Sequence, residues 1–166
     1  MQHYGGPTRL LDWTFSPYIA SYFSLERGNE ESCVYSLKHE YFTEIDKSHF
    51  KSVDYKDKVF EDQRGKDSFF SPYEPKMKNE RLVCQQGVFL VPSTNYETID
   101  DILRNYEVSD PVCIKYILNR KIRLDGLRKL KSMNITAASL FPGMDGFCRS
   151  LRLQVLETSK KIKRLC

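Results

Sequence analysis

The segment from His3 to Pro17 constrains the fold more than any other part of the chain. Gly5-Gly6-Pro7 marks a turn, because glycine accepts positive φ and proline fixes its own φ. Residues 8–15 are apolar-rich and compatible with a short strand. Ser16 before Pro17 is typical of a helix start, since serine accepts a free backbone N–H and proline at the first helical position loses no bond. The chain should therefore run from turn to strand to helix.

Two charged residues, Arg9 and Asp12, flank Leu10-Leu11 in this predicted strand. A charged group in a half-buried strand costs free energy unless it is paired. Residues three apart on a strand point to opposite faces, so these two should not pair with each other. Two interpretations remain open. Either both are structural, with Asp12 accepting helix N–H bonds and Arg9 pairing at the surface, or they belong to a site.

The remaining elements follow from hydrophobic periodicity and turn residues. Asn134 should end one helix in a left-handed turn. The few strands alternate irregularly with helices, which indicates an α+β fold with a small mixed sheet and flanking helices. We expect strands at 33–37, 87–92 and 112–118, an extended segment at 68–75, helices at 76–85, 98–105, 121–133 and 145–158, and a charged surface excursion over 39–67.

Composition supports one globular domain, which we place at residues 1–158 and follow with a basic tail at 159–166. The chain is 40% hydrophobic, and its formal net charge of +4 suits a small anion without requiring a nucleic acid. We interpret the tail as a solvated helix end, because no aromatic residues interleave its charges. No apolar run is long enough to span a membrane.

The cysteines exclude two classes of site. The five cysteines are scattered, with no C-x-x-C pair, and only three histidines accompany them. We therefore expect neither a metal site nor a disulfide framework, and a cytoplasmic protein with reduced thiols fits best.

The segment QHYGGPTRLLDWTFSPYIASYF resembles the central signature of the FRG domain, a family named for a Phe/Tyr-Arg-Gly motif. Two later segments resemble the same family, residues 79–92 (NERL…QQGVFLVP) and residues 140–147 (LFPGMDGF). The naming motif ordinarily lies on a strand upstream of His-Tyr-Gly. The sequence begins at Met1 without it, so we expect a fragment, a shortened relative or a misplaced start.

A further resemblance, to ADP-ribosyltransferase folds, implies a split sheet and NAD as the cofactor. Breaking the nicotinamide–ribose bond builds positive charge on the sugar, which a carboxylate in a water-poor cleft would stabilise. Gln85-Gln86 stand at the corresponding place, and amides would stabilise such a charge poorly. The catalytic candidates are Glu80, Gln86 and Asp12, and the sequence does not decide whether the protein is an enzyme.

These resemblances imply a polar cleft between residues 8–16 and the strand at 85–91. In it, Arg9 would face the anion, Trp13 or Tyr4 would stack, and Gln85 and Gln86 would hydrogen-bond. The structural alternatives are that His3 belongs to the turn and that the two amides satisfy backbone groups. We expect a small anionic or nucleotide-like ligand, or else a protein partner of a non-catalytic interaction domain. The predicted ligand-binding residues are His3, Tyr4, Thr8, Arg9, Asp12, Trp13, Ser16, Gln85 and Gln86.

Overall fold

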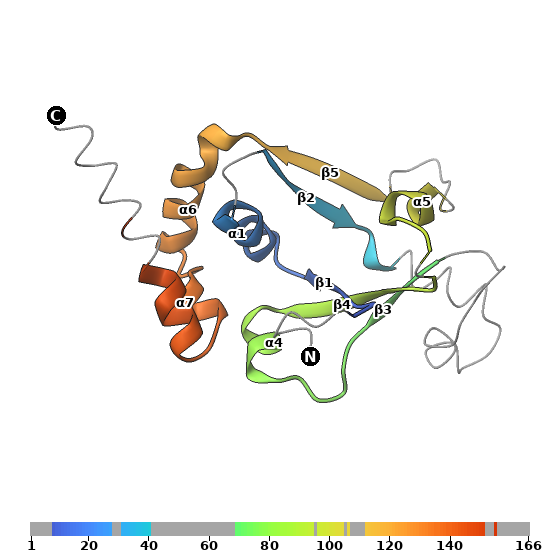
Figure 1. Ribbon diagram of the computed structural model, residues 1–166, viewed down its shortest axis with the longest axis horizontal. Coiled ribbons are helices and arrows are strands. Elements are labelled where there is room, and N and C mark those ends of the chain that lie inside the picture. The colour runs from blue at the N-terminus through green and yellow to red at the C-terminus, as the bar shows by residue number, and fades with distance from the viewer. Residues whose placement is uncertain are drawn as a thin grey trace. The chain divides into compact units, whose positions relative to one another are not determined.

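The computed structural model describes residues 8–27, 31–40, 69–94, 96–104, 106, 112–151 and 155. These residues form the predicted α+β fold (Figure 1), with two small sheets in place of the single mixed sheet that was expected. One sheet has three strands in the order β1-β4-β3, and the other pairs β2 with β5. The strands are β1 (Leu11–Thr14), β2 (Ser32–Leu37), β3 (Phe70–Tyr73), β4 (Gly87–Pro92) and β5 (Cys113–Leu118). The helices are α1 (Pro17–Arg27), α4 (Glu80–Cys84), α5 (Ile99–Arg104), the 3-10 helix η2 (Arg120–Ile122), α6 (Arg123–Ser132) and α7 (Ala137–Leu140), and residues 144–151 are also helical.

The predicted elements are confirmed wherever the structure describes them, with shifts at their ends. The helix expected over 76–85 is shorter, because Asn79 caps it by accepting from the backbone N–H of Leu82. Ser16 caps α1, as predicted, by accepting from the Ile19 backbone N–H at 3.3 Å. Asn134 has φ 59 and takes the predicted left-handed turn. Residues 41–67 of the predicted excursion and the tail at 159–166 lie outside the described residues.

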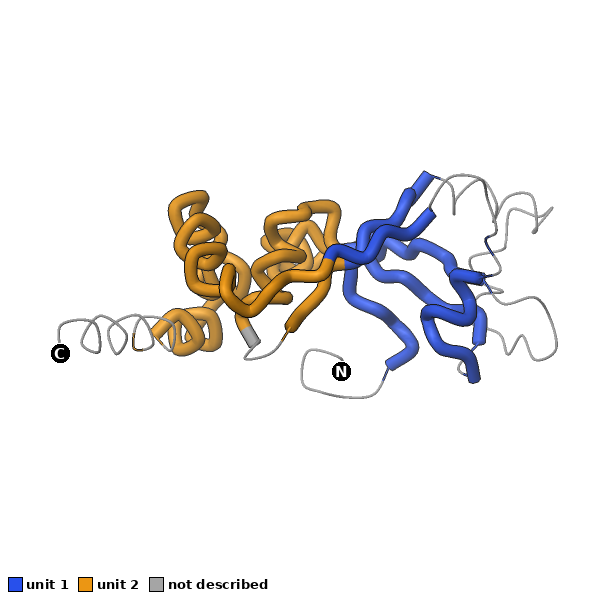
Figure 2. The backbone as a smooth tube through the Cα atoms, turned by 90° about the horizontal axis from the view of Figure 1, so that it is seen from above, with its two compact units in different colours: residues 1–13, 35–76, 88–116 blue, residues 14–34, 77–87, 117–166 orange. Residues whose placement is uncertain are grey.

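The chain divides into two compact units, each assembled from three separate segments (Figure 2). Unit 1 comprises residues 1–13, 35–76 and 88–116, and unit 2 comprises residues 14–34, 77–87 and 117–166. The assignment of residues 1–158 to a single domain stays a prediction.

Unit 1 is organised around the antiparallel pairing of β3 with β4, in which Phe70 faces Pro92 and Tyr73 faces Phe89. The core is closed by buried hydrogen bonds as well as by apolar contact. The Tyr106 hydroxyl accepts from the Phe70 backbone N–H at 2.7 Å, and the Ser93 hydroxyl accepts from Phe69 N–H at 3.0 Å. The buried core residues are Phe69, Phe70, Leu90, Val91, Ile102, Tyr106 and Val112.

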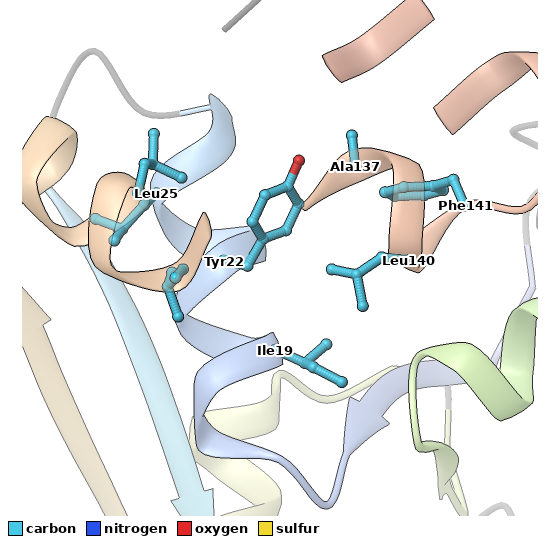
Figure 3. Packing of buried hydrophobic residues seen from close by; sticks show 8 residues of the cluster. Ile19, Tyr22, Leu25, Ala137, Leu140 and Phe141 are labelled. Carbon is cyan, nitrogen blue, oxygen red and sulfur yellow. The ribbon is translucent and has the colours of Figure 1, made fainter. Parts of the chain in front are cut away.

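Unit 2 is a helical unit, built on the apolar face of α1. The predicted stripe on that helix is confirmed, since Ile19 and Tyr22 are buried and Phe23 is partly buried. Arg123 fastens α6 to the end of α1, because its guanidinium donates to the carbonyl oxygens of Leu25 and Glu26, both at 2.7 Å. Figure 3 shows this core, whose buried members are Ile19, Tyr22, Leu25, Leu127, Leu130, Ala137, Leu140 and Phe141.

Candidate functional site

Arg9 is half-buried in unit 1, just before β1. Its terminal Nη2 donates to the carbonyl oxygen of Pro92, the last residue of β4, at 2.6 Å. A carbonyl acceptor carries no net charge, so this bond orients the guanidinium without neutralising it. Arg9 was singled out from the sequence as a charge in an apolar strand, and the structure shows that the end of β4 accepts its hydrogen bond. The role of Arg9 toward an anion stays a prediction.

The neighbouring candidates of unit 1 differ in their exposure. Thr8 and Asp12 are exposed, whereas Trp13 is partly buried and packs against the unit 1 core. Packing of Trp13 into the core is a structural role for the indole, and a stacking role for it stays a prediction. His3 and Tyr4 lie outside the described residues.

In unit 2 the end of β1 is hydrogen-bonded to the turn that joins α4 and β4. The Thr14 hydroxyl donates to the Gln85 carbonyl oxygen at 2.8 Å, and Phe15 N–H donates to the Gln86 carbonyl oxygen at 3.1 Å. These contacts and the adjacency of β1 and β4 in the sheet make the two predicted cleft segments neighbouring strands.

Gln85 and Gln86 occupy this turn in different ways. Gln85 is the C-cap of α4, and its side-chain amide donates to the Leu140 carbonyl oxygen at 3.0 Å. That is the backbone-satisfying role considered from the sequence. Gln86 is exposed and adopts φ 46, a left-handed backbone conformation that residues other than glycine rarely take.

The three catalytic candidates share one property, which is exposure to solvent. Glu80, Gln86 and Asp12 are all exposed. Glu80 is the first residue of α4, where its carboxylate interacts favourably with the helix dipole. A carboxylate stabilises a developing cation most strongly where water is excluded. The catalytic roles of these three residues stay predictions.

A cluster in unit 2 around the buried ring of Phe141 was not predicted from the sequence. The Arg81 guanidinium carbon lies 4.7 Å from the ring centroid, and that of Arg149 lies 4.1 Å from it. Arg149 also donates from Nε to Asp145 at 3.0 Å. Arg81 belongs to the NERL segment that resembles the FRG family, and the i,i+4 spacing of Asp145 and Arg149 predicts their ion pair. No local signal brings the two arginines to one ring.

Close backbone packing holds the helix that carries Arg149 against the end of α7. Helical residues 144–151 carry Arg149, and they pack closely on the end of α7 at Gly146. A Cβ atom at Gly146 would collide with the carbonyl oxygen of Phe141, so only glycine allows this approach. Phe23 supports the ring of Phe141 from α1 in an edge-to-face contact, with centroids 5.8 Å apart.

Tyr22 is buried at 1% exposure in the same core. Burial, together with the nearby Glu26 carboxylate, raises the pKa of Tyr22 well above its usual value, whereas Arg149 opposes the shift. Glu26 acts here through its charge, because no partner within hydrogen-bonding geometry is found for the Tyr22 hydroxyl among the described residues. The phenol is therefore neutral throughout the physiological pH range.

The part of the chain that the structure describes contains neither a cluster of metal ligands nor a membrane-spanning helix. No three His, Cys, Asp or Glu side chains there converge as metal ligands. Within those same ranges, every helix is too short or too polar to cross a bilayer.

Comparison with protein families matched the model of the FRG domain to residues 1–33. The match covers β1 and α1, with Arg9, Asp12, Trp13 and Ser16, and does not extend to residues 79–92 or 140–147. Comparison with curated proteins and with solved structures gave no match. The FRG resemblance is thus supported over the first strand and helix.

Proposed function

We propose that this chain is an FRG-domain protein that binds a small anionic, nucleotide-like ligand through the segment similar to that family. The observation that carries the proposal is the anchoring of Arg9, whose guanidinium is half-buried and held by the Pro92 carbonyl oxygen. A cation fixed in advance loses less conformational entropy on binding than a free surface arginine does. Trp13 would complete the binding residues from the same unit.

A finer form of the proposal assigns NAD as the ligand and ADP-ribosyl transfer as the reaction. It rests on the resemblance to ADP-ribosyltransferases, which is a likeness of fold and carries only that weight. The exposure of Glu80, Asp12 and Gln86 favours binding over catalysis. NAD-dependent labelling of protein that is lost in Glu80→Gln would establish the enzyme.

The second candidate is a non-catalytic domain that engages a protein partner. It is supported by exposed apolar side chains on the helix at residues 144–151, where Met144, Phe147 and Leu151 are 72%, 53% and 42% exposed. Scattered exposed apolar residues are normal, but a row on one helix more often marks an interaction surface.

The test is ligand-induced stabilisation, read together with the fluorescence of Trp13, which is the single tryptophan of the chain. NAD and ADP should raise the melting temperature with increasing concentration and change the Trp13 emission. Arg9→Gln should abolish the change in Trp13 emission and reduce the rise in melting temperature, because it retains an amide donor for Pro92 but removes the charge. Arg104→Gln is the matched control in unit 1, since Arg104 is an exposed arginine paired with Asp101.

The outcomes separate the two candidates. If neither nucleotide changes melting or fluorescence, and Arg9→Gln only lowers the melting temperature, the ligand proposal is overturned and the interaction domain is favoured. An equal loss of response in Arg104→Gln would reduce the effect to net charge.

A further inference from the structure

Arg81 carries a positive charge that no carboxylate neutralises among the described residues. Its Nε atom is buried and has no hydrogen-bond partner in that part of the chain. Burying a charged donor without a partner costs free energy, and most such groups in proteins are satisfied by protein, water or an ion. The Phe141 ring offsets part of this cost, since a cation over an aromatic face is attracted by the quadrupole of the ring.

A second cation lies against the same ring. The two centroid distances place the guanidinium carbons of Arg81 and Arg149 closer together than the Debye length of about 10 Å at 0.1 M salt. Solvent ions therefore screen their mutual repulsion incompletely. Asp145 offsets the charge of Arg149 only weakly, because the Asp145 side chain is 56% exposed to water.

The chemistry of the two guanidinium groups suits a tetrahedral oxyanion. Contact of the two guanidinium carbons with the Phe141 ring forms no N–H hydrogen bond to a polar acceptor, so the N–H donors can serve another acceptor. Arg149 meets Asp145 through Nε, which leaves its two terminal nitrogens outside that bond. Two guanidinium forks match a phosphoryl group, which offers three acceptor oxygens and a charge of about −1.5 to −2.

We propose that Arg81 and Arg149, held on the ring of Phe141, form a binding site in unit 2 for a phosphoryl group. This site uses none of the residues of the ligand site proposed above, and it does not depend on that proposal. Its ligand is identified by the phosphoryl group alone, which either inorganic phosphate or a nucleotide can supply.

The experiment titrates inorganic phosphate and, separately, ADP into the whole chain at constant pH and constant ionic strength set with chloride. The Nε–Hε resonances of the arginines are followed by ¹H–¹⁵N NMR. The Arg81 and Arg149 resonances should shift in a saturable way, and the melting temperature should rise with ligand concentration. Tighter binding of ADP by tenfold or more would identify a nucleotide as the source, and equal affinities would identify the bare phosphoryl group.

Three substitutions test the assignment. Arg81→Gln should remove the saturable response, and Arg149→Gln should weaken phosphate affinity by about tenfold or more. Arg128→Gln is the matched control, because Arg128 lies in the same unit and forms the comparable exposed pair with Asp125. Its phosphate affinity should equal that of the unsubstituted chain.

Arg81→Lys keeps the charge without the planar fork, so it should bind phosphate more weakly than arginine and more strongly than glutamine. The proposal is overturned if the Arg81 resonance does not shift with phosphate while Arg81→Gln merely melts earlier. It is also overturned if Arg128→Gln loses as much affinity as Arg81→Gln. Because Arg9→Gln should leave the phosphate response intact, failure here is distinguishable from failure at the Arg9 site.

Discussion

At the scale of single residues, Gln86 adopts a left-handed backbone conformation in the turn that joins α4 and β4. Two candidate binding residues, Gln85 and Gln86, lie in this turn. Gln86 and Asn134 are the non-glycine residues with positive φ in the described part of the chain. Asparagine tolerates this conformation because its short polar side chain can hydrogen-bond locally, and glutamine lacks that advantage. Gln86 keeps its place through its backbone, since its N–H donates to Val83 and its carbonyl oxygen accepts from Phe15.

We expect Gln86→Gly to raise the free energy of unfolding by up to about 1 kcal/mol, because glycine removes the steric penalty of the left-handed region. Gln86→Val should lower it by about 1–2 kcal/mol, since a β-branched residue tolerates this conformation poorly. Urea unfolding of both variants measures the difference, and Asn134→Gly, with a smaller gain, is the control. A clear loss of stability in Gln86→Gly would instead assign a packing role to the amide side chain.

The same contrast shows what the sequence reveals about residues. Asn134 was predictable because asparagine after a helix is a common left-handed terminator. The conformation of Gln86 was not, because glutamine carries no such signal. Arg9 stood out as a charge in an apolar strand, whereas Arg81 meets its ring only through the packing of α4 against α7.

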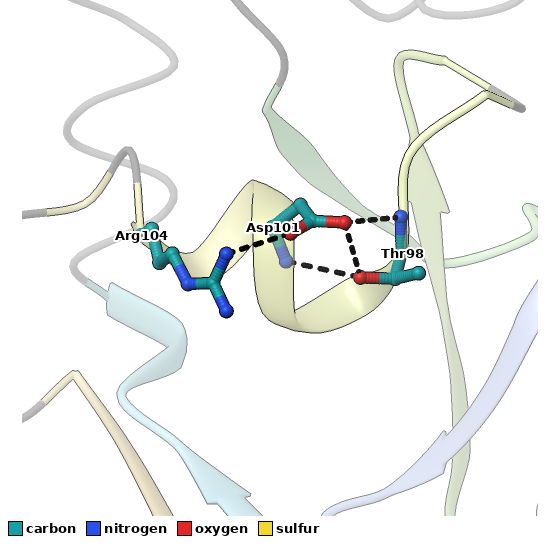
Figure 4. Close-up of polar contacts among 3 residues, drawn as sticks. All are labelled: Thr98, Asp101 and Arg104. Atoms are coloured by element: carbon teal, nitrogen blue, oxygen red, sulfur yellow. Dashed lines mark hydrogen bonds and ion pairs between the residues drawn. The ribbon is translucent and has the colours of Figure 1, made fainter.

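At the scale of elements, hydrogen bonds local to the first turn define the start of α5 (Figure 4). Asp101 accepts from the Thr98 hydroxyl at 2.6 Å and from its backbone N–H at 3.3 Å, and the Thr98 hydroxyl accepts from Asp101 N–H at 3.2 Å. Arg104 adds a pair at 2.8 Å to the other carboxylate oxygen. This reciprocal arrangement is a capping box with aspartate in place of glutamate.

Acid should weaken this cap. The Thr98 hydroxyl, and next its backbone N–H, hold the pKa of Asp101 below its usual value. A lowered folded-state pKa means that the stabilisation is complete above the unfolded-state pKa of about 3.9 and is lost as the pH falls through the folded-state pKa. Thr98→Ala should cost about 1 kcal/mol near neutral pH.

Urea unfolding near pH 7 and near pH 3 measures this loss, because these values lie on either side of the usual carboxyl pKa of about 3.9. Asp101→Asn should reduce the acid sensitivity, and Asp125→Asn, which alters an exposed pair in another helix, is the control. Equal acid sensitivity of the Asp101→Asn variant and the unsubstituted chain would contradict this role for the cap.

Local sequence patterns predicted the helices and strands well, but they did not predict which strands pair with each other. The strands expected at 33–37, 87–92 and 112–118 agree with β2, β4 and β5 to within one residue at each end. In β5 the large apolar side chains of Ile114 and Tyr116 are 42% and 51% exposed, and a strand pattern alone does not show which face is covered. The order β1-β4-β3 depends on contacts between distant segments, which no local period encodes.

At the scale of the whole molecule, neither unit is a continuous piece of chain. Three segments enter each unit, so the apolar face of α1 is covered by residues that follow it by a long stretch of sequence. The buried partners of Ile19, Tyr22 and Leu25 come from α6, from α7 and from Phe141. A helix as short as α1 depends on such tertiary burial, since isolated helices of this length are marginal in water.

Truncation after Tyr116 should therefore remove α6 and α7 and expose the apolar face of α1. We expect a loss of helical circular dichroism from α1 beyond the loss of the deleted helices, together with increased binding of a hydrophobic dye, because about 25 cal/mol is lost for each Å² of apolar surface returned to water. Deletion of residues 159–166 is the matched control, since the described core of unit 2 contains no residue beyond Phe141. That control should melt at the same temperature as the full chain. If the chain truncated after Tyr116 kept the helical signal of α1 and did not bind the dye, α1 would be stable on its own. Burial of its apolar face by α6 and α7 would then not be required for α1 to remain helical.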